Sequence, residues 1–69
     1  MNQCEMVVEY IKEHGSISSM EAFRDLGITR LSARIWELRS SGYMIDGTSE
    51  KYTAKNGRIV NYTRYRISK

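Results

Sequence analysis

The side chains with the clearest chemical potential in this sequence are its arginines and lysines. They number 11 among 69 residues, and the formal net charge is +3. Guanidinium and ammonium groups bind anions, above all carboxylates and phosphates. Three arginines lie close together in one stretch, and they are Arg30, Arg34 and Arg39. Anion binding is therefore the first chemistry to consider.

Side chains suited to catalysis or metal binding are scarce. The chain has one cysteine, Cys4, and one histidine, His14. One cysteine cannot form an internal disulfide, and this pair cannot build a closed zinc site. No glycine-rich phosphate loop is present, and no nucleophile is paired with the histidine. We therefore predict structural roles for both residues, no cofactor, no metal and no enzyme activity.

Charge is distributed unevenly along the chain. Up to Asp25 there are five acidic residues against two basic ones, a formal charge of −3. From Ile28 onward there are nine basic residues against three acidic ones, a formal charge of +6. Such asymmetry is typical of a protein with one face that meets phosphates. The alternative is a solvated basic half without a partner.

The three arginines belong to a stretch, residues 18–42, that predicts two short helices joined by a tight turn. Ser18 with Glu21 three residues later is a capping-box pattern. Gly27 is suited to end the first helix, and Thr29 is suited to cap the second. Two helices joined this closely must cross steeply, as in a helix-turn-helix. The predicted helices cover about residues 19–26 and about residues 30–41.

Apolar residues at helical spacing predict the buried faces of these two helices. A domain this small needs its large apolar side chains for the core, so we expect the stripes to be buried. The stripes are Met20, Phe23 and Leu26 in the first helix and Leu31, Ile35 and Leu38 in the second.

A further amphipathic helix is predicted at about residues 3–14. Asn2 and Glu5 form another capping-box pattern, and Gly15 follows the last turn. Residues 16–17 are too short for an independent strand, but they are placed to add a third strand to a later hairpin.

The last third of the chain alternates apolar and polar residues, which indicates β-strands. Asn56-Gly57 is a strong signal for a two-residue hairpin turn. Pairing about that turn does not place Ile45 opposite Tyr65, so we expect a bulge or an irregular arm near 46–49. The register is left open.

The order helix, short strand, helix, turn, helix, hairpin is that of a winged helix-turn-helix. The run SISSMEAFRDLGITRLSARIWELRSSGYMI, with a C-terminal YRI, resembles the small helix-turn-helix domain proteins common in bacteriophages and prophages. The resemblance implies one α+β domain over residues 1–69, with three helices and a C-terminal β-hairpin wing. The shared motifs are Glu21-Ala22, Leu26 to Leu31, Ala33 to Ile35, Leu38-Arg39 and Gly42-Tyr43.

Double-stranded DNA is the partner that this fold and charge pattern indicate. The helix at about 30–41 is expected to enter the major groove, and a basic wing at about 51–64 is expected to contact the backbone or a minor groove. The candidate contacts are Thr29, Arg30, Ser32, Ala33, Arg34, Trp36 and Arg39 in the helix, and Lys51, Lys55, Asn56, Arg58 and Arg64 in the wing.

Several of these residues have a structural alternative. Arg34 and Arg39 are equally suited to surface ion pairs with the acidic first half, and the wing residues to a solvated loop tip. Trp36 lies on the polar side of its helix, where it either packs under the wing or contacts a partner.

The functional prediction is sequence-specific DNA binding by a phage or prophage transcriptional regulator, cytoplasmic in a bacterial host cell. One module of this size buries only about 600–1,000 Å² on DNA. We therefore expect a homodimer or cooperative assembly on DNA, through exposed residues such as Trp36, Val60 or Tyr62. The alternatives are an excision or recombination accessory factor, and a protein-binding winged helix that engages a host factor.

Overall fold

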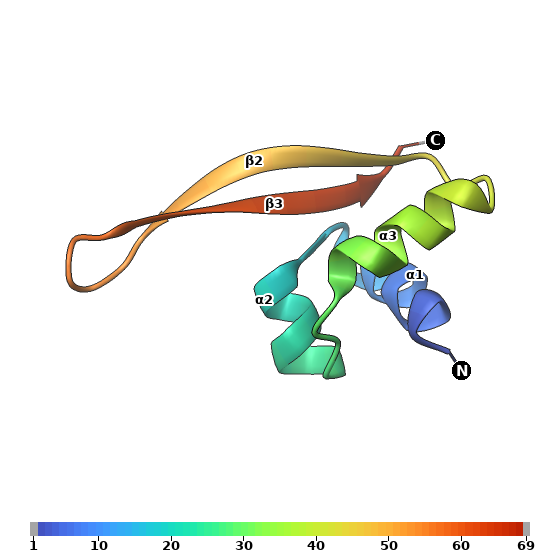
Figure 1. Ribbon diagram of the computed structural model, residues 1–69, viewed down its shortest axis with the longest axis horizontal. Helices are drawn as coiled ribbons and strands as arrows, with labels where there is room; N and C mark the ends of the chain where they lie inside the picture. Colours follow the sequence, from blue (N-terminus) through green and yellow to red (C-terminus); the bar gives the residue numbers. More distant parts are fainter. Residues whose placement is uncertain (1, 69) are drawn as a thin grey trace.

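The computed structural model describes residues 2–68 and has the α+β architecture expected of a winged helix. Among these residues, none of the helices has the length and apolar character needed to cross a membrane. The strands form one antiparallel sheet in the order β1-β3-β2 (Figure 1). The elements are α1 (Gln3–His14), β1 (Ile17–Ser18), α2 (Ser19–Glu21), the π-helical segment η1 (Ala22–Leu26), α3 (Leu31–Ser40), β2 (Ile45–Thr53) and β3 (Ile59–Ile67).

Helix α1 begins and ends as its sequence predicts. The Asn2 side chain accepts a hydrogen bond from the Glu5 amide at 2.8 Å, and the Glu5 carboxylate accepts one from the Asn2 amide at 3.1 Å. Both orphan donors are thus satisfied, as in a capping box. Gly15 then takes a left-handed conformation, with φ of 91°, and its amide bonds the Ile11 carbonyl.

The predicted core stripe of the next helix is confirmed at Leu26 and wrong at Met20 and Phe23. Its capping box between Ser18 and Glu21 is present, but Met20 and Phe23 are 67% and 62% exposed. The inward positions are Ser18, Ala22 and half-buried Leu26, which follow one another at intervals of four. Small Ser and Ala side chains let this segment approach the core closely, and the larger side chains on its other face stay in solvent.

Helix α3 buries the predicted stripe but begins differently at its N-terminus. Leu31, Ile35 and Leu38 are all at most 5% exposed. The N-cap residue is Arg30, and no side chain caps the helix, so the predicted cap by Thr29 is wrong. The first amides of α3 are therefore left without a side-chain partner from residues 2–68.

One core unites the three helical segments with the base of the sheet. Its largest fully buried side chains are Val7 of α1, Ile17 of β1, Ile28 of the turn and Ile35 of α3. Half-buried Cys4, Met6, Leu26, Tyr65 and Ile67 pack around it.

The hairpin has a regular register, and the predicted bulge is absent from it. Nine pairs run without interruption from Ile45 opposite Ile67 to Thr53 opposite Ile59. The loop has three residues rather than two, because the Ala54 amide bonds the Arg58 carbonyl at 2.8 Å. Gly57 takes the left-handed position that such loops require, with φ of 85°. The expected mismatch does not arise, because Ile45 pairs with Ile67 and Tyr65 pairs with Gly47.

The short strand predicted near residues 16–17 is present as β1. It pairs Ile17 with Tyr65 and Ser18 with Arg64, which covers only the inner part of β3. From Arg64 toward the hairpin loop, only β2 and β3 continue, as a two-stranded ribbon that projects past the helices (Figure 1). The molecule is accordingly elongated, with extents of 39 × 23 × 21 Å.

Candidate nucleic-acid interface

The N-terminal end of α3 presents small polar side chains and one free cation. Thr29, Arg30 and Ser32 are exposed, and Ala33 is half-buried. The Arg30 side chain makes no hydrogen bond or ion pair with residues 2–68. This guanidinium is available to an external anion.

Trp36 lies one turn after Ser32 on the same exposed side of α3. Its side chain is 69% exposed, so it does not pack beneath the wing. Residues three or four apart are neighbours on a helix surface, so Ser32 and Trp36 form a continuous patch. Of the two roles considered for Trp36, contact with a partner is the one compatible with this exposure.

Arg34 is engaged within the molecule. It donates to the Gln3 side chain at the start of α1 and to Glu37 on its own helix, both at 3.1 Å. Its Nε atom is buried without a partner among residues 2–68. The contact thus ties α3 to α1, and it uses a residue of its own helix where the sequence suggested an acidic partner from the first half.

Arg39 joins the last turn of α3 to the first residue of β2. Two of its nitrogens, Nε and Nη2, donate to the Ile45 carbonyl at 3.1 and 2.8 Å. The partner is therefore a backbone oxygen and not the carboxylate that the sequence suggested as an alternative. This link holds the base of the hairpin against α3.

The wing loop gathers three of the predicted contacts in a few residues. Lys55, Asn56 and Arg58 are all exposed, and Lys51 is exposed on β2 nearby. The Asn56 side chain accepts a hydrogen bond from the Arg58 amide at 3.0 Å, which shapes the loop. The three cations form no ion pair with any carboxylate of residues 2–68.

Arg64 differs from the other wing cations because its guanidinium is surrounded by acidic groups. It donates to Glu21 of α2 at 3.1 Å and to Glu50 of β2 at 3.0 Å, and its side chain is 19% exposed. The hydrogen bond from Arg64, followed by one from Tyr62, lowers the pKa of Glu50 below its usual value. The bond to Glu50 likewise raises the pKa of Arg64. Both groups therefore stay ionised and paired.

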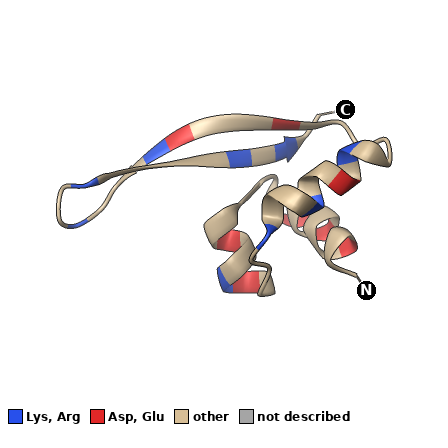
Figure 2. Ribbon diagram, viewed as in Figure 1, with Lys and Arg blue, Asp and Glu red and all other residues tan. Residues whose placement is uncertain are grey.

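Figure 2 shows how the charges divide over the molecule. Acidic positions lie on α1, α2, η1, α3 and β2, whereas the loop between β2 and β3 carries only basic ones. Four arginines of the described residues form ion pairs that largely balance their charge, and they are Arg24, Arg34, Arg64 and Arg66. Within residues 2–68 and outside α1, the cations with neither an ion pair nor a side-chain hydrogen bond are Arg30, Lys51, Lys55 and Arg58. Arg39 also keeps its charge, but its guanidinium is held by the Ile45 carbonyl.

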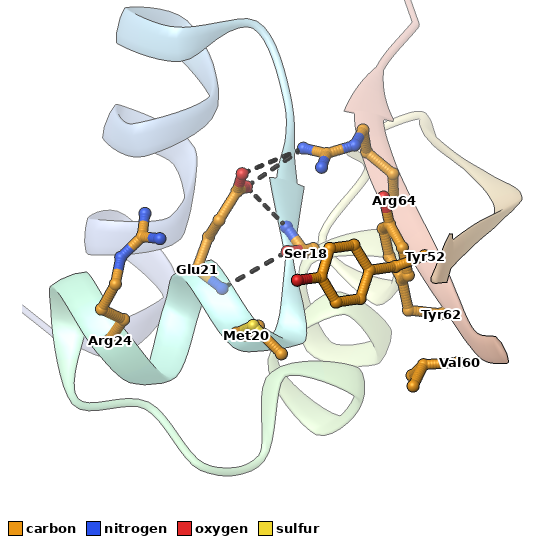
Figure 3. Close-up of a pocket in the computed structure, with 8 residues that line it drawn as sticks. All are labelled: Ser18, Met20, Glu21, Arg24, Tyr52, Val60, Tyr62 and Arg64. Atoms are coloured by element: carbon orange, nitrogen blue, oxygen red, sulfur yellow. Dashed lines mark hydrogen bonds and ion pairs between the residues drawn. The ribbon is translucent and has the colours of Figure 1, made fainter. Parts of the chain in front are cut away.

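A cleft between α2 and the wing is a feature that the sequence did not reveal. Its volume is about 320 Å³, and Met20 faces Tyr52, Val60 and Tyr62 across it (Figure 3). Arg64 and Glu21 also line it. The cleft depends on the hairpin register, which the sequence left open. Only the three-residue loop places Tyr52 opposite Val60 and Glu50 opposite Tyr62.

Cys4 and His14 contact only structural neighbours in the part of the chain described. The Cys4 thiol donates to Glu37 at 3.2 Å, and partial burial followed by that carboxylate raises its pKa. A thiol with a raised pKa is a poor nucleophile at neutral pH. The His14 ring lies 4.3 Å from the Tyr10 ring, centroid to centroid.

A comparison with protein-family models decides the family. The model described as a winged helix-turn-helix domain matches residues 2–69. The chain belongs to the winged helix-turn-helix domain family. Comparisons with curated proteins and with solved structures give no match.

The winged helix-turn-helix assignment gives each element a place in a known architecture. In a helix-turn-helix the second helix is the recognition helix, which here is α3. The hairpin of β2 and β3 is the wing. The free cations therefore lie on the two parts of a winged helix that are suited to nucleic acid.

Proposed function

We propose that this winged helix binds double-stranded DNA, with α3 in the major groove and the wing on the phosphate backbone or an adjacent minor groove. The observation that carries the proposal is the set of unpaired cations at the start of α3 and on the wing. Cations that neutralise phosphates release condensed counterions, which favours binding. These residues are Arg30, Lys51, Lys55 and Arg58.

The proposal uses the residues at the N-terminal end of α3 and Trp36. Arg30 is suited to a bidentate contact with guanine, and Ser32 to a base edge or a phosphate. Thr29 and Ala33 lie on the same end of α3, and Trp36 offers a large apolar surface one turn further on. Arg34, Arg39 and Arg64 hold the scaffold together.

The biological role we propose is transcriptional regulation in a phage or prophage, which rests on the resemblance of the helix-turn-helix sequence. A single module gives a small interface of about 600–1,000 Å². Useful specificity then requires two or more protomers on neighbouring half-sites. A recombination accessory factor would use the same DNA contacts.

The salt dependence of duplex binding tests the proposal. Three phosphate contacts from the wing cations predict a slope of about −2.7 in a plot of log K against log salt. Affinity is then expected to fall roughly 40-fold as salt rises from about 50 to about 200 mM. Fluorescence anisotropy with a labelled random-sequence duplex measures this slope. An anisotropy that does not change when protein is added at the lower salt concentration contradicts the proposal.

A matched pair of variants locates the surface. Lys55→Ala and Lys12→Ala each remove one exposed, unpaired positive charge, the first from the wing and the second from α1. Lys55→Ala is expected to reduce the magnitude of the slope by about 1, and Lys12→Ala is expected to leave it unchanged. Equal effects of the two substitutions would show that only net charge matters.

Exposed apolar side chains favour a second candidate function, docking onto a protein. Phe23, Trp36 and Met44 are each more than 60% exposed. Trp36 is the single tryptophan of the chain, so its fluorescence reports on α3 alone. A fluorescence change on adding duplex supports the DNA proposal, and its absence together with absent retention favours the protein partner.

A further inference from the structure

A network of ionic hydrogen bonds connects α2 to both strands of the wing. Arg64 Nη1 donates to Glu21 at 3.1 Å and to the Ser16 hydroxyl at 3.0 Å. Its Nε atom donates to Glu50 at 3.0 Å, and the Tyr62 hydroxyl donates to the same carboxylate oxygen at 2.9 Å. One side chain of β3 thereby bridges α2, the segment before β1, and β2.

The network lies at the point where the sheet narrows. Strand β1 ends its pairing with β3 at Ser18 opposite Arg64, and toward the tip only β2 and β3 continue. A two-stranded ribbon has little independent stability and twists strongly. Contacts at this junction therefore control the direction in which the ribbon leaves the helices.

The network has no positive charge to spare for a phosphate. Arg64 faces two carboxylates, and the second cation near Glu50 is Arg66 at 3.7 Å. Two arginines and two glutamates sum to zero formal charge. The Arg64 side chain is 19% exposed, against 48% for Arg66, and the close-up shows its guanidinium directed at Glu21 (Figure 3).

We propose that Arg64 is a positioning residue, which sets the angle of the wing relative to α3 by bridging Glu21 and Glu50. The inference rests on the proposed function insofar as the wing meets DNA. A planar guanidinium donates in two directions at once, which an ammonium group on a flexible stem does less well. The bridge holds the wing cations in the orientation that contacts the duplex before binding occurs. Binding therefore does not include the entropy cost of ordering the wing, which would otherwise reduce the affinity.

Glu21→Gln separates this role from direct phosphate contact by the sign of its effect. Glutamine keeps an oxygen for the Ser18 amide, so the capping box of α2 survives. The variant removes one of the two negative charges that hold Arg64, so the bridge between α2 and the wing weakens although Glu50 still accepts from the guanidinium. Positioning predicts about fivefold weaker duplex binding, although the protein has become more positive. Unchanged or tighter binding would overturn the proposal.

A double-mutant cycle shows whether Arg64 acts through the wing. Arg64→Gln is expected to weaken duplex binding about tenfold in the native background, but about twofold in the presence of Lys55→Ala and Arg58→Ala. General destabilisation predicts the same factor in both backgrounds, and that result contradicts the proposal. Arg24→Gln is the matched control, since it breaks an exposed ion pair on η1 with Asp25 at 2.8 Å.

The wing angle is also measurable without DNA, which keeps this inference separate from the proposed function. Spin labels at Glu13→Cys on α1 and Asn56→Cys in the wing loop, in a Cys4→Ala background, report their distance distribution by pulsed electron paramagnetic resonance. Glu21→Gln and Arg64→Gln are expected to broaden the distribution about twofold, and Arg24→Gln is not. An unchanged width refutes positioning even if duplex binding is confirmed, and a broadened width supports it even if duplex binding fails.

Discussion

At the residue scale, four arginines that were all predicted to contact DNA differ in their surroundings. Arg34 finds Gln3 and Glu37, Arg39 finds a backbone carbonyl, and Arg64 finds two carboxylates, whereas Arg30 finds none among residues 2–68. The nearest acceptor decides which guanidinium is available to an anion. Sequence shows the charge of a side chain but not the acceptor that the fold places beside it.

The pair of Asp25 and Arg24 leads to a prediction about pH. The hydrogen bonds from Arg24, followed by one from Tyr10 at 2.6 Å, lower the pKa of Asp25 well below its usual value. A lowered folded-state pKa gives stability that is present above about pH 4 and is lost as the pH falls toward the folded value. Asp25→Asn is therefore expected to flatten the fall of Tm between about pH 5 and about pH 2.

Circular dichroism melts across that pH range measure the effect on Tm. Asp46→Asn is the control, because Asp46 makes no ion pair or side-chain hydrogen bond with residues 2–68. It should leave the slope of Tm against pH close to that of the native chain. In Asp25→Asn, part of the slope of Tm against pH is expected to remain, because the pKa of Glu50 is also lowered and its protonation also destabilises the folded state. A slope unaffected by Asp25→Asn contradicts the prediction.

At the element scale, the capping residues were the most informative part of the sequence. Both capping boxes and the helix ends at Gly15 and Gly27 were predicted, because each depends on local chemistry. The cap at Thr29 was not, because α3 begins one residue later, with Arg30 at its N-cap. The buried face of α2 and η1 was not predicted. The prediction placed the largest apolar residues in the core, whereas the buried face is centred on the small residue Ala22. A close approach of two elements favours small side chains, and hydrophobicity does not reveal it.

The corrected face of this segment gives a stability prediction. Phe23→Ala is expected to lower the free energy of unfolding by less than about 0.5 kcal/mol, since the ring is largely in solvent and alanine favours helix. Ile28→Ala is expected to cost about 2–5 kcal/mol, because Ile28 is 1% exposed. Ile28→Val is expected to lower the free energy of unfolding by about 1 kcal/mol, and it replaces Ile28→Ala in the test where the larger truncation unfolds the chain. Urea unfolding measures all three, and a cost for Phe23→Ala similar to that of Ile28→Ala contradicts the corrected face.

The hairpin shows where a local signal misleads by one residue. Asn56-Gly57 correctly marks the turn, but the hydrogen bond between Ala54 and Arg58 sets a three-residue loop. That shift of one residue decides which side chains share a face of the ribbon. The cleft and the Arg64 network both follow from it, so neither was accessible from the sequence.

At the scale of the whole molecule, the candidate DNA contacts lie far apart along one axis. Figure 1 shows the wing loop at one end of the long axis, while α3 begins near α2 and runs toward the opposite end. The long axis measures 39 Å, which is an upper bound on the separation of the two surfaces, and one turn of B-DNA spans about 34–36 Å. A protomer that uses both surfaces is therefore expected to need no more than about one helical turn of duplex.

A series of hairpin-closed duplexes of about 6, 12 and 18 base pairs tests this footprint. Affinity per protomer is expected to rise at least tenfold from the shortest to the middle length and then level off, because the shortest duplex cannot reach α3 and the wing together. The decisive comparison is Arg30→Ala, which should weaken binding to the middle length and have no effect on the shortest, because the shortest duplex binds the three wing cations. Fluorescence anisotropy gives the affinities, and sedimentation gives the number of protomers bound to the longest duplex. Full affinity for the shortest duplex, with an undiminished effect of Arg30→Ala, would mean that both surfaces fit within half a turn and would contradict the proposed arrangement along the long axis.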